Sequence, residues 1–243
     1  MNLFYKIGEF FNRVGESFYN SIIYDNRYEY ILEGLFHTIL IAFFAVIMGI
    51  IIGLFLALIC HYHDNTGKLK ILNGISKTYI NIIRGTPVLL QLMIIYYVIF
   101  KSVNINIIIV GILAFGLNSG AYVAEIIRSG LISIDKRQME AGYSLGLKYN
   151  TIMKNIILPQ AIKNILPALG NEFITLLKET SVGAYIGIIE LTKASDIIAS
   201  RTYDYFFPLI IVAIIYLIMT FSLAKLISTL ERKFKNAWSK KNK

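Results

Sequence analysis

The sequence GLFHTILIAFFAVIMGIIIGLFLALIC, residues 34–60, decides the fold class. None of its 27 residues is Asp, Glu, Lys or Arg. At about 1.5 Å per residue, a helix of this length crosses the roughly 30 Å hydrocarbon layer of a bilayer. The segment must be helical because lipid offers no partner to unpaired backbone groups. It therefore predicts an all-α integral membrane protein.

The composition of the whole chain agrees with a membrane protein. Of its 243 residues, 56% are hydrophobic and 16% are charged, whereas soluble domains are about 25% charged. A formal charge of +9 would favour nucleic acid as the partner of a soluble protein. Here long apolar stretches separate the basic residues, so they indicate orientation in a membrane, and we expect no nucleic-acid partner. The single cysteine, Cys60, excludes an internal disulfide, and we expect no metal site.

Four more apolar segments bring the expected number of spans to five. They cover about residues 87–100, 105–127, 165–191 and 206–227. The segment 87–100 is short and must borrow flanking residues such as Ile80 to Ile83 to reach across the bilayer. Residues 1–33 precede the spans. Within them, apolar residues recur at three- and four-residue steps over 3–23, which predicts an amphipathic helix in the membrane interface.

The charges between the spans predict the orientation. Residues 61–84 carry a net charge of +3, residues 128–164 carry +4, and the chain from Lys225 onward carries +6. Residues 1–33 and 190–204 carry −2 and −1. Because basic loops stay in the cytoplasm, we expect a cytoplasmic loop at about 128–164 and a basic cytoplasmic tail at 231–243. Five spans then leave the N-terminus outside.

Small residues recur at four-residue steps in two of the spans. They are Ala45, Gly49, Gly53 and Ala57 in the first span, and Gly116, Gly120 and Ala124 in the third. Such stripes let helix backbones approach closely in lipid. They indicate helix packing within one subunit or, alternatively, a seam between two subunits. Pro87 and Pro167 are expected near helix starts, where a missing N–H costs little.

The expected cytoplasmic loop carries the motif on which the functional hypothesis depends. Residues 140–160 read EAGYSLGLKYNTIMKNIILPQ. The stretch resembles the EAA loop of ABC importer permeases, written E-A-A, three residues, G, nine residues, I, one residue, L-P. Every spacing matches, and the one departure is Gly142, where the pattern has alanine. The matching positions are Glu140, Ala141, Gly142, Gly146, Ile156, Leu158 and Pro159.

Further motifs resemble the polar amino-acid permeases among these importers. They are Arg84-Gly-Thr-Pro87 with Gln91, then Ala121-Tyr122 with Glu125 and Arg128, then Pro159-Gln160-Ala161, Leu166-Pro167, Asn171 and Lys178-Glu179-Thr180-Ser181. The resemblance implies the type I importer fold, with a five-helix permease core over residues 34–230.

The same resemblance implies what the protein does and with what it assembles. It implies a permease subunit that translocates a polar amino acid across the bacterial plasma membrane. The implied partners are a dimer of ATPase subunits that bind ATP and Mg, a second permease that is a copy or a relative, and an external amino-acid-binding protein. We expect no cofactor and no enzyme activity in this chain, since Gly67-Lys68 lacks the remainder of a P-loop.

A permease needs a short helix that docks into its ATPase, and the EAA-like loop can supply one. Asp135 is placed to cap the start of that helix, and Gly146 to end it in a left-handed turn. Glu140 and Ala141 would then face the partner. The residues expected to couple the permease to the ATPase are Glu140, Ala141, Gly142, Gly146, Leu158 and Pro159.

The fourth span carries polar residues that suit an amino-acid substrate. Helical spacing places Asn171, Thr175 and Lys178 on one stripe and Glu172 and Glu179 on a second. Such a helix offers an acceptor for an ammonium and donors for a carboxylate. Alternatively, Lys178 and Glu179 pair with neighbouring helices or lie near the external face, and Glu172 is structural. Asn118 and Ser119 in the third span are expected to hydrogen-bond across helices.

Two other function classes compete with the importer hypothesis. In an ion-gradient-driven secondary amino-acid transporter, Glu172 would relay a proton or sodium ion, but no inverted repeat is evident in the five spans. A membrane-embedded enzyme would need a catalytic cluster, and the sequence shows no grouped His, Cys or Asp motif.

Overall fold

The computed structural model describes the backbone of residues 2–241 and the side chains of residues 7–9 and 11–233. Every regular element in this range is helical, which confirms the all-α class. The α-helices are α1 Asn2–Phe18, α2 Tyr28–Thr66, α3 Lys70–Gly85, α4 Val88–Ile94, α5 Ile107–Ile132, α6 Lys136–Ser144, α7 Tyr149–Ile152, α8 Leu158–Glu179, α9 Leu191–Thr202 and α10 Phe206–Lys241. Single π-helical turns cover Tyr19–Ile23, Ile95–Ile99 and Met153–Ile157, and 3₁₀ turns cover Tyr24–Asn26 and Thr180–Ile186.

Three helices within the described residues are long and apolar enough to cross a membrane. They are α2, α5 and α10, the last counted over Phe206–Lys233. They coincide with the first, third and fifth spans expected from the sequence. A fourth crossing is possible if α3 and the helical segment Val88–Ile99 form one bent span.

The expected second span, with the residues that it borrows, forms a bent segment and not one straight helix. The borrowed residues Ile80 to Ile83 belong to α3, and α3 meets the segment Val88–Ile99 at an angle of 108°. Thr86 is extended and Pro87 precedes the first turn of α4. Because proline disfavours the helical conformation in the residue before it, the chain bends here. The expected start of a helix at Pro87 is confirmed.

The expected fourth span is shifted along the chain. Its helix α8 begins at Leu158 and ends at Glu179, and Pro167 lies in its interior rather than near its start. Residues 180–191 leave the helix through the 3₁₀ turn Thr180–Ile186 and Gly187, whose φ is +95°. A glycine adopts this left-handed conformation without strain, so the chain can reverse towards α9.

The two stripes of small residues face each other in the packing of α2 on α5. A Cβ on Gly49 would lie 2.8 Å from the Ser119 side chain, and one on Gly53 would lie 2.5 Å from Cγ1 of Val123. A Cβ on Gly120 would lie 2.8 Å from Ile52. This confirms that the stripes pack within one subunit, where close approach in lipid requires small residues.

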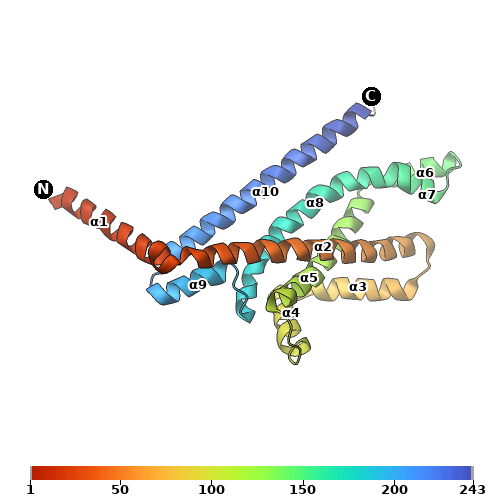
Figure 1. Ribbon diagram of the computed structural model, residues 1–243. Helices are drawn as coiled ribbons and strands as arrows, with labels where there is room; N and C mark the ends of the chain where they lie inside the picture. The colour runs from red at the N-terminus through yellow and green to blue at the C-terminus, as the bar shows by residue number, and fades with distance from the viewer. Residues whose placement is uncertain (1, 242–243) are drawn as a thin grey trace.

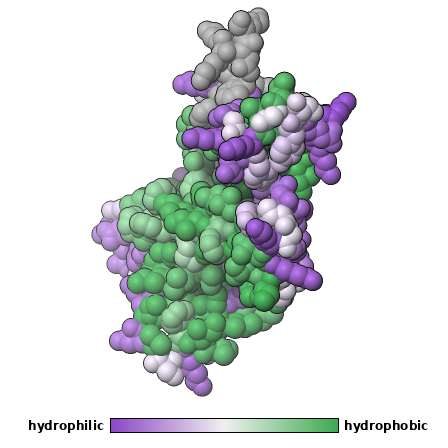
Figure 2. Space-filling model, turned by 90° about the vertical axis from the view of Figure 1, so that its right-hand side faces the viewer, coloured by the Kyte–Doolittle hydropathy of each residue, from purple (hydrophilic) through white to green (hydrophobic). Residues whose placement is uncertain are grey.

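Helix α10 packs more loosely, and a groove of about 650 Å³ separates its C-terminal half from α8. The groove is lined mainly by apolar side chains, among them Ile162, Leu166, Pro167, Ile227 and Leu230. Figure 2 shows one broad apolar surface of the molecule, bordered by hydrophilic side chains. Many of the large apolar side chains of α2 and α10 are exposed, as expected for helices that contact lipid or another membrane subunit.

The ends of the bundle differ in which elements they hold. Figure 1 shows α6 and α7 beside the turn between α2 and α3, far from α1 and α9. The two basic loops of the sequence analysis, 61–84 and 128–164, therefore meet at one end of the molecule. The N-terminal helix α1 and the π turn Tyr19–Ile23 cover the helix expected at 3–23, and Ser17 and Ser21 donate hydrogen bonds to Asp204, before α10.

Candidate functional site

The EAA-like loop folds as a short helix with a defined start and end. Asp135 accepts a hydrogen bond from the Arg137 amide (2.9 Å) and so caps α6. Hydrogen bonds from Arg137 hold the pKa of the Asp135 carboxyl below its usual value. After α6, Gly146 has a φ of +74° and its amide donates to the Tyr143 carbonyl (2.9 Å). Both the predicted cap and the predicted left-handed glycine are confirmed.

Gly142 explains the one departure from the E-A-A pattern. It is buried against Ile152 of α7, and a Cβ here would lie 2.7 Å from Cδ1 of that side chain. The Leu147 amide also donates to the Gly142 carbonyl (3.1 Å). The glycine thus lets α6 fold back closely onto α7, and alanine would require Ile152 to move.

The remaining expected coupling residues divide between two elements. Glu140 and Ala141 are exposed on α6, close to Leu145, which is 78% exposed. Leu158 and Pro159 instead form the first turn of α8. A charged side chain beside small and apolar exposed ones is a surface on which another protein can dock.

Side-chain hydrogen bonds connect this loop to the membrane helices. The Tyr149 hydroxyl of α7 and Nε2 of His61 in α2 are 2.9 Å apart. Gln138 of α6 and Gln160 of α8 bond to each other through their amides. The loop is therefore bonded to α2 through α7 and to α8 through α6. Sequence reasoning missed His61, because its partner lies 88 residues away.

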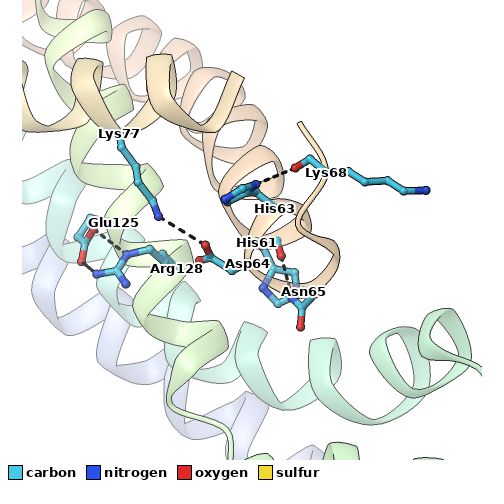
Figure 3. A network of polar contacts seen from close by, with 8 residues as sticks. All are labelled: His61, His63, Asp64, Asn65, Lys68, Lys77, Glu125 and Arg128. Atoms are coloured by element: carbon cyan, nitrogen blue, oxygen red, sulfur yellow. Dashed lines mark hydrogen bonds and ion pairs between the residues drawn. The ribbon is translucent and has the colours of Figure 1, made fainter. Parts of the chain in front are cut away.

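Charged residues link α2, α3 and α5 at the same end of the bundle (Figure 3). Lys77 of α3 lies 3.4 Å from Asp64 of α2. Glu125 of α5 accepts a hydrogen bond from Arg128 (3.0 Å) and lies 3.5 Å from Arg84 of α3. Arg84, Glu125 and Arg128 are thus brought together from two separate motifs.

The polar stripes of α8 lie as the helical spacing predicts. Asn171, Thr175 and Lys178 are exposed, whereas Glu172 and Glu179 are half-buried. Glu172 accepts a hydrogen bond from the Ser119 hydroxyl of α5 (2.8 Å). This partner carries no charge, so it leaves the charge of an ionised Glu172 uncompensated.

The hypothesis that Asn118 and Ser119 bond across helices is confirmed. Asn118 donates to Gln91 of α4 (2.9 Å), and the Gln91 amide donates in turn to Thr86 Oγ1 (2.7 Å) and to the Ile83 carbonyl (2.8 Å). Gln91 therefore donates to the carbonyl of Ile83, a backbone group near the end of α3 that the bend leaves without a helical donor.

Comparison with known proteins gives the family to which these elements belong. Residues 49–236, which begin within α2 and end within α10, match the family of binding-protein-dependent transport system inner membrane components. This chain belongs to that family. The match includes both the EAA-like loop and the polar stripes, so it covers the part of the chain that carries the candidate site.

Individual relatives of this permease family match over most of their length. A putative glutamine transport system permease protein from Rickettsia typhi is 41% identical over 84% of this chain and 92% of its own length. An arginine transport system permease protein from Bacillus subtilis is 39% identical over 85% of this chain and 93% of its own. A crystal structure of an amino acid ABC transporter with histidines superposes with a TM-score of 0.78 at 45% identity, over 84% of this chain and 94% of that one.

Proposed function

We propose that this chain is the permease subunit through which an ABC importer moves a polar amino acid across the bacterial plasma membrane. The observation that carries the proposal is the exposed α6, held by its cap and by Gly142 in a chain of the permease family. Relatives described as glutamine and arginine transport permeases support the substrate class. The ATP and Mg would be bound by a separate pair of ATPase subunits docked on Glu140 and Ala141.

The candidate substrate contacts are the polar stripes of α8. Glu172 and Glu179 would accept the ammonium of the amino acid, and Asn171, Thr175 and Lys178 would donate to its carboxylate. A second permease, either a copy or a relative, would complete the pathway, and an external binding protein would deliver the substrate. Family membership does not favour the ion-gradient alternative, since the matched family is defined by a binding protein.

We also infer five membrane crossings: α2, the bent pair α3 and α4, α5, α8 and α10. By the positive-inside rule, the basic loops favour a cytoplasmic α6, an external N-terminus and a cytoplasmic end of α10. Single-cysteine labelling in a background without Cys60 tests this arrangement. Reaction of a Ser144→Cys variant with an impermeant reagent in intact cells would contradict it.

Reconstitution tests the function itself. The permease, its ATPase and its binding protein are placed in proteoliposomes, and uptake of each labelled polar amino acid is measured with and without ATP. We expect uptake of at least one amino acid that requires both ATP and the binding protein. Uptake driven by a proton or sodium gradient in the absence of ATP would establish the alternative.

A further inference from the structure

One carboxylate outside the candidate site lies completely buried where several helices meet. Glu190, just before α9, has no exposed surface. Its oxygens accept hydrogen bonds from the amides of Thr192 (2.8 Å) and Lys193 (2.7 Å), so it caps α9. The Tyr216 hydroxyl of α10 donates to the same carboxylate at 3.2 Å. These donors compensate the loss of water around a group that is costly to bury.

The Tyr216 hydroxyl lies where several helices meet. The side chains of Thr192 in α9, Thr38 in α2 and Thr180, the first residue after α8, lie beside it. Thr38 and Thr180 are completely buried. One hydroxyl group of α10 is therefore bonded to the cap of α9 and faces both α2 and the end of α8, two residues beyond Lys178.

The backbone around Glu190 is fitted closely to α2. A Cβ on Gly34 would lie 2.9 Å from the carbonyl of Glu190. The Leu191 amide donates to the Thr38 hydroxyl (3.2 Å), and Nδ1 of His37 lies 2.8 Å from the Ile189 carbonyl oxygen. Segment 189–191 therefore has a fixed position on α2. Tyr216 bonds α10 to it, beside the packing of Leu191 with Val212.

We propose that Glu190 and Tyr216 are positioning residues for transport. They hold the C-terminal end of α8, which lies directly after the polar stripes, in contact with α2 and α10. This contact keeps the outer end of the pathway closed until the loaded binding protein binds. The inference rests on the proposed function and on the proposed orientation. It assigns the buried carboxylate a part in the transport cycle that a purely structural cap would not have.

The test compares Tyr216→Phe with Tyr205→Phe in the complete reconstituted complex. Tyr216→Phe keeps the ring and the Glu190 cap of α9 but removes the hydroxyl. Tyr205 is 54% exposed just before α10, so its variant loses the same atom outside the contact. ATP hydrolysis is measured with and without the substrate-loaded binding protein, together with the thermal stability of each complex.

We expect Tyr216→Phe to raise ATP hydrolysis in the absence of the binding protein several-fold and to lower the ratio of stimulated to basal hydrolysis towards one. Tyr205→Phe should match the wild type. An unchanged ratio in Tyr216→Phe, with or without a loss of thermal stability, would overturn the proposal. Absence of amino-acid uptake by the wild-type complex would instead refute the proposed function.

Discussion

Helices α2 and α5 pack far more closely than α8 and α10 do. In the first pair, Gly49 and Gly53 bring the backbone of α2 against side chains of α5. In the second pair, Gly170 approaches Ile227 closely, but a groove of about 650 Å³ opens beside this contact. In the most apolar 18-residue stretch of α5, 61% of the residues are buried, whereas in that of α10 only 11% are buried.

The difference separates a closely packed, fixed part of the permease from a part that exposes its apolar surface. A close-packed interface resists displacement, because moving either helix creates clashes or voids. The pair α8 and α10 leaves a groove between its helices and exposes apolar surface to which lipid or another subunit can bind. The residues of α8 that line the groove end at Gly170, so the polar stripes begin directly after it.

The largest effect is expected from overpacking the fixed part. Gly53→Leu would drive a side chain into Val123, and overpacking of a core costs about 1–3 kcal/mol or more. We expect strongly reduced membrane accumulation and a lower melting temperature. The matched control is Ile162→Trp, which adds bulk beside the groove and should leave both nearly unchanged. Equal loss in the two variants would show that the groove is filled in the assembled complex.

The next effect concerns the docking surface. Glu140→Lys reverses an exposed charge on α6 without touching the packing of Gly142 on Ile152. We expect normal membrane insertion and little ATP-driven uptake, because the ATPase would contact a positive charge at the position where it now contacts a negative one. Asn150→Lys, exposed in the same loop, controls for added positive charge. Full uptake by Glu140→Lys would exclude the coupling role of this residue.

A smaller effect is expected at the polar stripe of α8 that contains Glu172. Glu172→Gln keeps the shape of the side chain but removes its charge. A hydrogen bond to a charged group contributes about 1.5–3 kcal/mol, so apparent substrate affinity should fall by roughly ten- to a hundredfold. Basal ATP hydrolysis should survive. Ser119→Ala removes the hydroxyl that bonds to Glu172 while keeping the charge, and it should retain affinity. If Glu172→Gln transports with unchanged affinity, Glu172 is not a substrate ligand.

The smallest effect is expected at the attachment of α1. Hydrogen bonds from Ser17 and Ser21 hold the pKa of the Asp204 carboxyl below its ordinary value. A depressed pKa means that the ionised form stabilises this contact above the usual aspartate pKa of about 3.9, and that the stabilisation is lost as pH falls below it. The protection of residues 17–23 against hydrogen exchange, expressed relative to the intrinsic exchange rate at each pH, should therefore fall on acidification. An identical pH profile in Asp204→Asn would contradict this.

The sequence predicted features that depend on local periodicity. The three long apolar helices, the Asp135 cap, the left-handed Gly146 and the two stripes of α8 all follow from spacing along one segment. The 108° bend before Pro87 was missed, because apolar content measures the length of a span and not its direction. A proline at a helix start was the available signal.

Contacts between distant segments could not be predicted in this way. The carboxylate of Glu190 is bound by Tyr216 of α10 as well as by the amide of Thr192. The sequence placed Glu190 at the end of the fourth expected span, where a charged loop begins. Its position directly before the first turn of α9 could have indicated a cap. The contact of His61 with Tyr149 has no local signal, and only the fold brings these residues together.

The π-helical turn at Met153–Ile157 gives the chain one place where a residue can be removed without turning α8. It lies between α7 and α8, and a π turn holds one residue more than an α turn. Deletion of one residue there would restore α geometry and keep the later side chains of α8 on nearly the same face. Deletion of one residue within α8 before Asn171 would instead rotate Asn171 and Thr175 by about 100° relative to α6. Single-residue deletions should therefore be tolerated in this turn and selected against in the first half of α8.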